Sequence, residues 1–205
     1  MRIRLSQVGK RFNRDWIFRK ASLDFTFPNT YAITGPNGSG KSTLLQIIGC
    51  ILQPSEGTIS FTKNQKEIAA EKLVEYISFC APYLDVIEEM TLFEFLRFHS
   101  HFKPIINSFD LGKIIEIVDL KNAAQKQIRY YSSGMKQRVK LAQAIFSNTP
   151  VLLLDEPCTN LDTAGIELYY SLINNYCQNR LIIVSSNDEI EYKFCRERVP
   201  ILDYK

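Results

Sequence analysis

The sequence lacks any apolar run that approaches the roughly 20 residues needed to cross a bilayer. Its longest candidates, at 151–154 and 181–184, have the length of single strands. The N-terminus does not resemble a signal peptide either, because no apolar stretch of adequate length follows its first charges. If the chain works at a membrane, we expect another protein to hold it there.

The sequence also has little excess charge of either sign. The 25 Lys and Arg residues against 22 Asp and Glu leave a net charge of +3, which is too little, without a basic cluster, to predict nucleic-acid binding. The five cysteines are odd in number and show no Cys-x-x-Cys spacing, so we expect them reduced and buried in a cytosolic chain. Of the two histidines, His99 and His101, we expect two exposed side chains rather than a metal pair, because they point to different sides of a helix.

Strand and helix patterns alternate along the chain. Alternating apolar residues predict strands within the first 34 residues, and shorter strands are predicted at 58–62 and 199–202. Continuous Val, Ile and Leu runs at 151–154 and 181–184 predict strands that are buried on both faces. Helical spacing predicts helices at 41–51, near 165–176, at 189–195 and within 91–147, the last of these opening with a Thr91-x-x-Glu94 capping box. This order favours an α/β fold with a mainly parallel sheet. We expect one domain, 1–205, with a β lobe and an inserted helical lobe at about 83–147.

A glycine-rich segment follows the short strand expected at 31–34. It reads Gly-Pro-Asn-Gly-Ser-Gly-Lys-Ser and matches G-x-x-x-x-G-K-[ST] at the start of the helix expected from Lys41. Glycines let consecutive backbone N–H groups point inward as a nest for phosphate oxygens, and the helix start adds a partial positive charge. Lys41 brings a full charge, and the Ser42 hydroxyl is a hard ligand for Mg²⁺. The predicted nucleotide-binding residues are Gly35, Pro36, Asn37, Gly38, Ser39, Gly40, Lys41, Ser42 and Thr43.

Two acids end the apolar strand expected at 151–154. Open parallel sheets bind ligands at the carboxyl ends of their strands, which is where this strand delivers Asp155 and Glu156. Together with the glycine-rich segment, this placement predicts that Asp155 belongs to the Mg²⁺ site beside Ser42. It also predicts that Glu156 polarises an attacking water.

These segments together resemble the nucleotide-binding domain of ATP-binding cassette (ABC) transporters, over nearly the whole chain. Tyr131-Ser-Ser-Gly-Met-Lys-Gln-Arg-Val is similar to the family signature, and 157–162 resembles the loop after the catalytic glutamate. Phe12 falls where the family places an aromatic residue on adenine. Trp16 is an alternative for that role, and it reads equally well as a core indole. The resemblance implies a P-loop NTPase fold, antiparallel β lobe included, that binds ATP and Mg²⁺.

The resemblance also implies a head-to-tail dimer. Each ATP would lie between the glycine-rich loop of one subunit and the signature segment of the other, here Ser132, Ser133, Gly134 and Met135. The implied function is an ATPase subunit on the inner face of the cell membrane that powers transport through separate transmembrane subunits. A second cassette, identical or different, completes the dimer, and no nucleic acid is expected. Two alternatives remain open: an ATP switch that acts on a macromolecule, and a poorly hydrolysing cassette paired with an active partner.

Three positions depart from the family pattern. Pro82 occupies the hinge position where the family usually has glutamine, and no glutamine occurs between Lys66 and Ala124. Asn187 occupies the position of the switch histidine that contacts the γ-phosphate, and a neutral amide cannot exchange a proton near pH 7 as imidazole can. The signature carries Ser133 for glycine and Met135 for glutamine. We therefore expect ATP and Mg²⁺ binding with slow hydrolysis.

Overall fold

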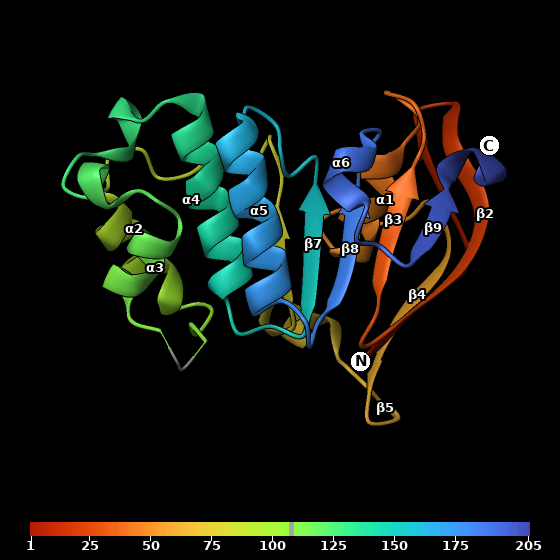
Figure 1. The fold of residues 1–205 in the computed structure, drawn as a ribbon. Coiled ribbons are helices and arrows are strands. Elements are labelled where there is room, and N and C mark those ends of the chain that lie inside the picture. Colours follow the sequence, from red (N-terminus) through yellow and green to blue (C-terminus); the bar gives the residue numbers. More distant parts are fainter. Residues whose placement is uncertain (107–108) are drawn as a thin grey trace. The chain divides into compact units, whose positions relative to one another are not determined.

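The computed structural model describes residues 1–106 and 109–205, which form two compact units (Figure 1). Unit 1 comprises Met1–Phe79, Pro150–Glu156 and Asn179–Lys205, and unit 2 comprises Cys80–Thr149 and Pro157–Gln178. The chain therefore enters unit 2 twice, once at Cys80, the last residue of β6 (Ile77–Cys80), and once directly after Glu156. The expected single domain with a helical lobe at 83–147 stays a prediction.

Unit 1 contains two sheets. The antiparallel sheet has the order β2-β1-β4-β5, from β1 (Arg2–Phe12), β2 (Asp15–Thr26), β4 (Glu56–Lys63) and β5 (Lys66–Glu67). The second sheet has the order β6-β7-β8-β3-β9, from β6 (Ile77–Cys80), β7 (Val151–Asp155), β8 (Leu181–Ser185), β3 (Thr30–Thr34) and β9 (Glu197–Pro200). In it β3 pairs in parallel with β8 and β9, and β7 pairs in parallel with β8. The predicted α/β class is confirmed.

The sequence pattern explains the difference between the two sheets. In β1, Ile3 and Leu5 are buried while Arg2 and Arg4 are exposed, the alternation of a strand with one face on a core. Every residue of β7 and β8 is buried, as expected for parallel strands covered on both faces.

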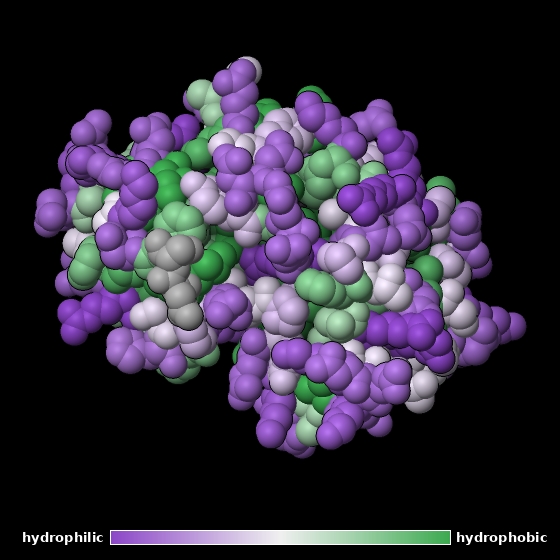
Figure 2. Space-filling view, turned by 60° about the horizontal axis from the view of Figure 1, so that its bottom comes forward, coloured by the Kyte–Doolittle hydropathy of each residue, from purple (hydrophilic) through white to green (hydrophobic). Residues whose placement is uncertain are grey.

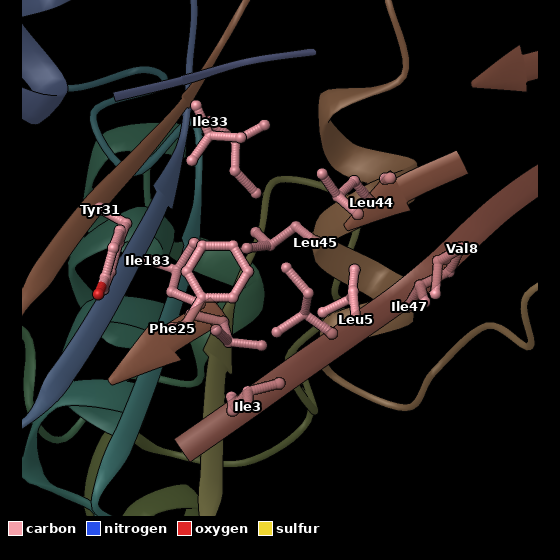
Figure 3. Close-up of a cluster of buried hydrophobic side chains, with 14 of the residues drawn as sticks. Ile3, Leu5, Val8, Phe25, Tyr31, Ile33, Leu44, Leu45, Ile47 and Ile183 are labelled. Atoms are coloured by element: carbon pink, nitrogen blue, oxygen red, sulfur yellow. The ribbon is translucent and has the colours of Figure 1, made fainter. Parts of the chain in front are cut away.

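Helix α1 (Lys41–Ile48) packs between these sheets in the core of unit 1. Its buried Leu44, Leu45 and Ile47 meet side chains of β1 and β2 on one side and of the parallel sheet on the other (Figure 3). The cluster includes Ile3, Leu5, Val8, Phe25, Tyr31, Ile33 and Ile183. Because burial of apolar area is the main driving force of folding, this cluster fixes the first turn of α1 against the carboxyl ends of the central strands.

Unit 2 is helical. Its longer helices are α2 (Leu92–Ser100), α3 (Leu111–Ile117), α4 (Ser133–Phe146) and α5 (Thr163–Tyr176), with short 3₁₀ turns at Lys121–Ala123 and Ile128–Tyr130. Helix α4 packs against α2, α3 and α5. The capping box predicted at Thr91 is confirmed, because the Thr91 Oγ1 accepts from the Glu94 backbone N–H and the Glu94 carboxylate accepts from the Thr91 backbone N–H.

Several predicted boundaries are wrong. Helix α1 ends at Ile48 rather than Ile51, because Gly49 closes its last turn and Cys50 takes a left-handed φ of 57°. The helix predicted at 189–195 covers only α6 (Glu189–Tyr192). The last strand ends at Pro200, which has no N–H for a ladder, and a 3₁₀ turn follows at Ile201–Tyr204.

Two expectations about single side chains are also wrong. Cys50 is exposed, although Cys80 and Cys177 are buried as predicted, and Cys158 and Cys195 are half-buried; none of these five cysteines forms a disulfide within the described residues. His99 is half-buried rather than exposed, and only His101 lies on the surface. The reason lies in tertiary packing, since the His99 Nε2 lies 3.0 Å from the Ser147 Oγ at the end of α4.

The surface contains small hydrophobic groups within largely hydrophilic surroundings on the face drawn in Figure 2. The exposed apolar side chains of unit 2 are Tyr83, Ile87, Phe93, Phe98, Phe102 and Tyr130. Within the parts of the chain that the structure describes, no helix is both long enough and apolar enough to span a bilayer.

Candidate functional site

A loop of unit 1 connects the end of β3 with the start of α1. Gly35, Gly38 and Gly40 all have positive φ, and Gly40 forms the N-cap of α1 at 102°. Two features require glycine at position 40: its positive φ, and the Ile17 Cγ2, which would lie only 2.5 Å from a Cβ at this position. The glycines thus give this segment a curled backbone that other residues adopt only with strain.

Lys41 is the charged group of this loop. Its side chain is only 4 % exposed, and its Nζ donates to the Pro36 carbonyl at 3.1 Å, so the ammonium folds back across the loop. The neighbouring Ser39 is also buried, and its Oγ has no hydrogen-bond partner within the described residues. A buried ammonium and an unpartnered hydroxyl are groups that an anion can satisfy.

The loop encloses a pocket of about 220 Å³. Its lining residues are Ile17, Asn37, Gly38, Gly40, Lys41, Ser42, Thr43 and Glu156. The structure therefore brings the glycine-rich segment and Glu156 together, although more than a hundred positions separate them in the chain. Ile17, which reaches the pocket from β2, was missed by the sequence reasoning. A strand pattern gives no sign of which other element its residues face.

Ser42 and Asp155 form the polar pair beside this pocket. Asp155, at the end of β7, is 1 % exposed, and its Oδ1 accepts a hydrogen bond of 3.0 Å from the Ser42 Oγ. A hydroxyl and a carboxylate oxygen are the hard donors that Mg²⁺ prefers. In residues 1–106 and 109–205 no group of three or more His, Cys, Asp or Glu side chains is placed to hold a metal ion. A set of one hydroxyl and one carboxylate fits Mg²⁺ that completes its shell with phosphate oxygens and water, which is the usual protein mode for this ion.

Glu156 lies at the rim of the pocket in a strained backbone. Its φ of 42° is left-handed, and its backbone N–H donates to the Ser185 carbonyl at 2.9 Å. For a residue with a Cβ this conformation costs about 1–2 kcal/mol. Strained backbone conformations of this kind occur mostly at active sites and ligand-binding sites, where they fix the direction of a side chain.

The remaining residues predicted for the nucleotide lie outside the pocket lining. Phe12, at the end of β1, is 48 % exposed, and the Lys10 Nζ lies 5.1 Å from its ring centre. Trp16 is half-buried, with the Arg19 guanidinium 4.1 Å and the Arg11 guanidinium 5.6 Å from its ring centre. The open ring of Phe12 thus offers more surface for stacking than the indole does.

Asn187 lies in the turn after β8. It is exposed and does not line the pocket. Its neighbour Asp188 caps α6 by accepting from the Ile190 backbone N–H at 2.9 Å. The Asp188 cap therefore fixes the backbone next to Asn187, and the Asn187 side chain is exposed to solvent.

The segment that resembles the signature begins helix α4 in unit 2. The exposed Ser132 is the N-cap, since its Oγ accepts from the Met135 backbone N–H at 3.3 Å, and Ser133 is exposed as well. A Cβ on Gly134 would lie 2.9 Å from the Asn160 carbonyl oxygen. Glycine therefore lets this helix start approach the loop that follows Glu156 in the chain.

Side chains of helix α4 also donate hydrogen bonds to both segments at which the chain enters unit 2. The buried Gln137 donates its amide to the Pro157 carbonyl at 2.7 Å, and the Lys140 ammonium donates to the Pro82 carbonyl at 2.7 Å. The sequence reasoning did not single out Gln137 or Lys140. Pro82, where the family usually has glutamine, is thus fixed through its backbone.

A hollow of about 720 Å³ in unit 2, between α2 and α3, is a weaker candidate. Its acids already have partners: Glu94 is engaged in the capping box, and Glu116 pairs with Lys113 and Lys121. The smaller pocket of unit 1 therefore remains the candidate site, because its charged groups suit an anion and a cation together.

The fold and site of unit 1 together define a P-loop nucleotide-binding protein. A family model for ABC transporters matches residues 18–159. Two uncharacterized ABC transporter ATP-binding proteins of Bacillus subtilis (strain 168) are similar: YdbJ, 30% identical over 80% of this chain and 54% of its own length, and YybJ, 31% identical over 90% and 85%. The structure of a dimeric ATP-binding cassette, bound to ADP and Pi after hydrolysis, superposes with a TM-score of 0.80 at 22% identity, covering 97% of this chain and 94% of that one.

The chain belongs to the ABC transporter family, as one of its ATP-binding cassettes. The predicted P-loop NTPase fold is confirmed. The chain spans only about half the length of YdbJ, so that protein extends beyond the region they share. The roles predicted for individual site residues stay predictions.

Proposed function

We propose that this cassette binds Mg·ATP in the pocket of unit 1 and hydrolyses it, and so powers transport through separate membrane subunits. One observation carries the proposal. A buried ammonium, a hydroxyl–carboxylate pair and a second carboxylate lie at one 220 Å³ pocket, at the carboxyl ends of β3 and β7. No other hollow described above offers both an anion site and a hard cation site.

Each group has a role in this proposal. The loop amides and Lys41 bind the phosphates, with Lys41 leaving the Pro36 carbonyl to do so. Ser42 and Asp155 would hold Mg²⁺, and the ion, when bound, supplies positive charge where negative charge develops on the phosphates. Glu156 orients a water and accepts its proton, and its strained backbone keeps the carboxylate at the pocket rim.

We extend the proposal to a dimer. Ser132 and the first N–H groups of α4 form an exposed helix start that suits an anion. The segment 131–139 itself contains no glycine-rich loop or acidic pair that would bind a nucleotide there. A second cassette, identical or different, would bring Ser132, Ser133, Gly134 and Met135 to the nucleotide of this one. The dimeric neighbour supports this arrangement. The relatives named as transporter ATP-binding proteins favour transmembrane subunits as partners and the cytoplasmic face as the location.

We propose that turnover is slow. Asn187 faces solvent as a neutral amide where the family carries its switch histidine. Loss of one positioned contact to the γ-phosphate typically lowers the rate by about 10²–10³. The same residue favours a second candidate, in which the chain binds ATP without useful turnover beside an active cassette.

Glu156→Gln tests the hydrolytic part. ATP affinity, measured calorimetrically, should stay within about threefold, because the amide keeps the size of the carboxylate. Turnover should fall by about 10²–10⁴, because an amide accepts no proton. Glu71→Gln, which alters an exposed acid that does not line the pocket, is the control and should change neither quantity.

The assay uses the chain alone and the chain captured from membranes with its partners. Equal turnover of Glu156→Gln and wild type would remove Glu156 from the mechanism. ATP binding with no turnover in either preparation would favour the second candidate.

A further inference from the structure

Ser185 is the last residue of β8 and is completely buried, at 0 % exposure. Its Oγ has no hydrogen-bond partner within the described residues. The next residue, Ser186, is equally buried, but its Oγ accepts from the Asp188 backbone N–H at 2.9 Å. A buried hydroxyl without a partner has a desolvation cost that no hydrogen bond offsets, so it calls for an explanation, and a partner gained in another state of the protein is one.

The strand register tells which way Ser185 points. It lies opposite Asp155 of β7 on one side and opposite Ile33 of β3 on the other. Directly paired residues of neighbouring strands project from the same face of a sheet, about 4.8 Å apart. Asp155 reaches Ser42 in the first turn of α1, and Ile33 packs in the core cluster with residues of α1. The Ser185 hydroxyl therefore lies on the α1 face, beside the Asp155 carboxylate.

A change at Asp155 would give this hydroxyl a partner. In the present structure the Asp155 Oδ1 accepts from Ser42. In the proposed function the Ser42 Oγ and the Asp155 Oδ1 both bind one cation. Their mutual hydrogen bond is then lost, so Ser42 no longer orients the Asp155 carboxylate. Ser185 is the adjacent buried hydroxyl with a free proton to donate. Its carbonyl also accepts from the Glu156 backbone N–H, so one residue lies against both acids.

We propose that Ser185 is a positioning residue of the cation site. In the loaded protein its Oγ donates a hydrogen bond to the Asp155 carboxylate and holds it toward the divalent ion. This inference rests on the proposed function, and it names a residue that neither the glycine-rich motif nor the acidic pair contains.

The proposal predicts opposite effects on the empty and the loaded protein. In Ser185→Ala an unsatisfied buried hydroxyl is removed, so the melting temperature in EDTA should be equal to or higher than that of wild type. The ratio of the ATP dissociation constant in EDTA to that in excess Mg²⁺, measured calorimetrically, should fall about tenfold, the loss expected for one hydrogen bond to a charged group. A serine with a purely structural role would lower the melting temperature and leave this ratio unchanged.

Two further variants make the test decisive. Ser78→Ala removes a buried hydroxyl of the same unit that already bonds Arg180, so it should lower the melting temperature and keep the ratio. Ser185→Cys keeps the shape with a weak donor and should give an intermediate ratio; it replaces Ser185→Ala if that variant does not fold.

The outcomes separate the two proposals. Wild-type protein that binds ATP with an unchanged ratio in Ser185→Ala and Ser185→Cys would overturn the role of Ser185 and leave the proposed function intact. Wild-type protein that binds no Mg·ATP would overturn both.

Discussion

The glycine-rich loop of unit 1 and the signature-like segment of unit 2 are both helix starts suited to anions, yet they are built differently. The first lies at a pocket with a buried lysine and a carboxylate pair, and Ser42 and Asp155 already bond each other there. The second is an exposed serine cap whose anchor is the loop after Glu156, which Gly134 approaches closely. In the proposed function, the first region contains the groups that bind the phosphates and Mg²⁺, and the second offers a surface that completes the site of another cassette. The comparison favours binding by the single chain and hydrolysis that depends on a second cassette.

The largest expected effect comes from the charged group of the first region. Lys41→Ala should weaken Mg·ATP binding about 100-fold, or ~3 kcal/mol, because it removes a buried cation from contact with the phosphates. Isothermal titration calorimetry measures the change, and Lys126→Ala, an exposed lysine of unit 2, is the control. An affinity within threefold of wild type would show that Lys41 does not contact the nucleotide.

A smaller effect is expected where the second region meets its anchor. Gly134→Ala places a methyl group 2.9 Å from the Asn160 carbonyl, so α4 or the loop must shift, and we expect unfolding to become easier by about 1–3 kcal/mol. Calorimetric affinity for ATP should not change, because the pocket lies in unit 1. Turnover at high protein concentration should fall.

Gly112→Ala in α3 is the matched control. Its new methyl group would lie 3.2 Å from the Asp110 Oδ1, a side-chain atom that caps α3, and alanine is the better helix former, so stability should change less than in Gly134→Ala. Equal stability of the two alanine variants would mean that Gly134 is not a site of close approach.

The last expected effect, of about the same size as that of Gly134→Ala, is a pH dependence of stability that belongs to unit 2. Burial, with a contribution from the charge of Lys103, lowers the pKa of His99 to about 4. The unfolded chain, with an ordinary pKa near 6.5, then binds more protons between pH 6.5 and 4, so the free energy of unfolding falls as the pH falls through this window. We expect a loss of about 2 kcal/mol, reduced from the full linkage value because the ring is partly exposed to solvent.

Urea unfolding of wild type and His99→Gln at pH 7 and pH 4.5 measures this loss, because titrating carboxylates contribute equally to both proteins. Both histidines belong to unit 2, so the effect should be confined there, and His101→Gln, which alters the exposed histidine, is the control. The same pH dependence in wild type and His99→Gln would contradict the assignment.

The sequence predicted the elements that depend on neighbouring residues. The loop from Gly35 to Ser42, the buried strands that end at Asp155 and Ser185, and the Thr91 cap all follow from contiguous patterns. It failed at α1 after Ile48 and at the end of β9, because a single left-handed residue or a proline ended an otherwise suitable apolar pattern.

What the sequence by itself determined is the set of reactive groups and the strand or helix that carries each. The sequence also predicted that Ser42 and Asp155 meet, because the carboxyl ends of parallel strands share one edge of the sheet. Only the tertiary structure decided which other distant groups meet: Ile17 in the pocket, Gln137 on the Pro157 carbonyl and His99 against the Ser147 hydroxyl. The physical reason is that hydrogen-bonding preference and apolar periodicity act over a few residues. Contacts across sheets and between helices depend instead on the packing of the whole core.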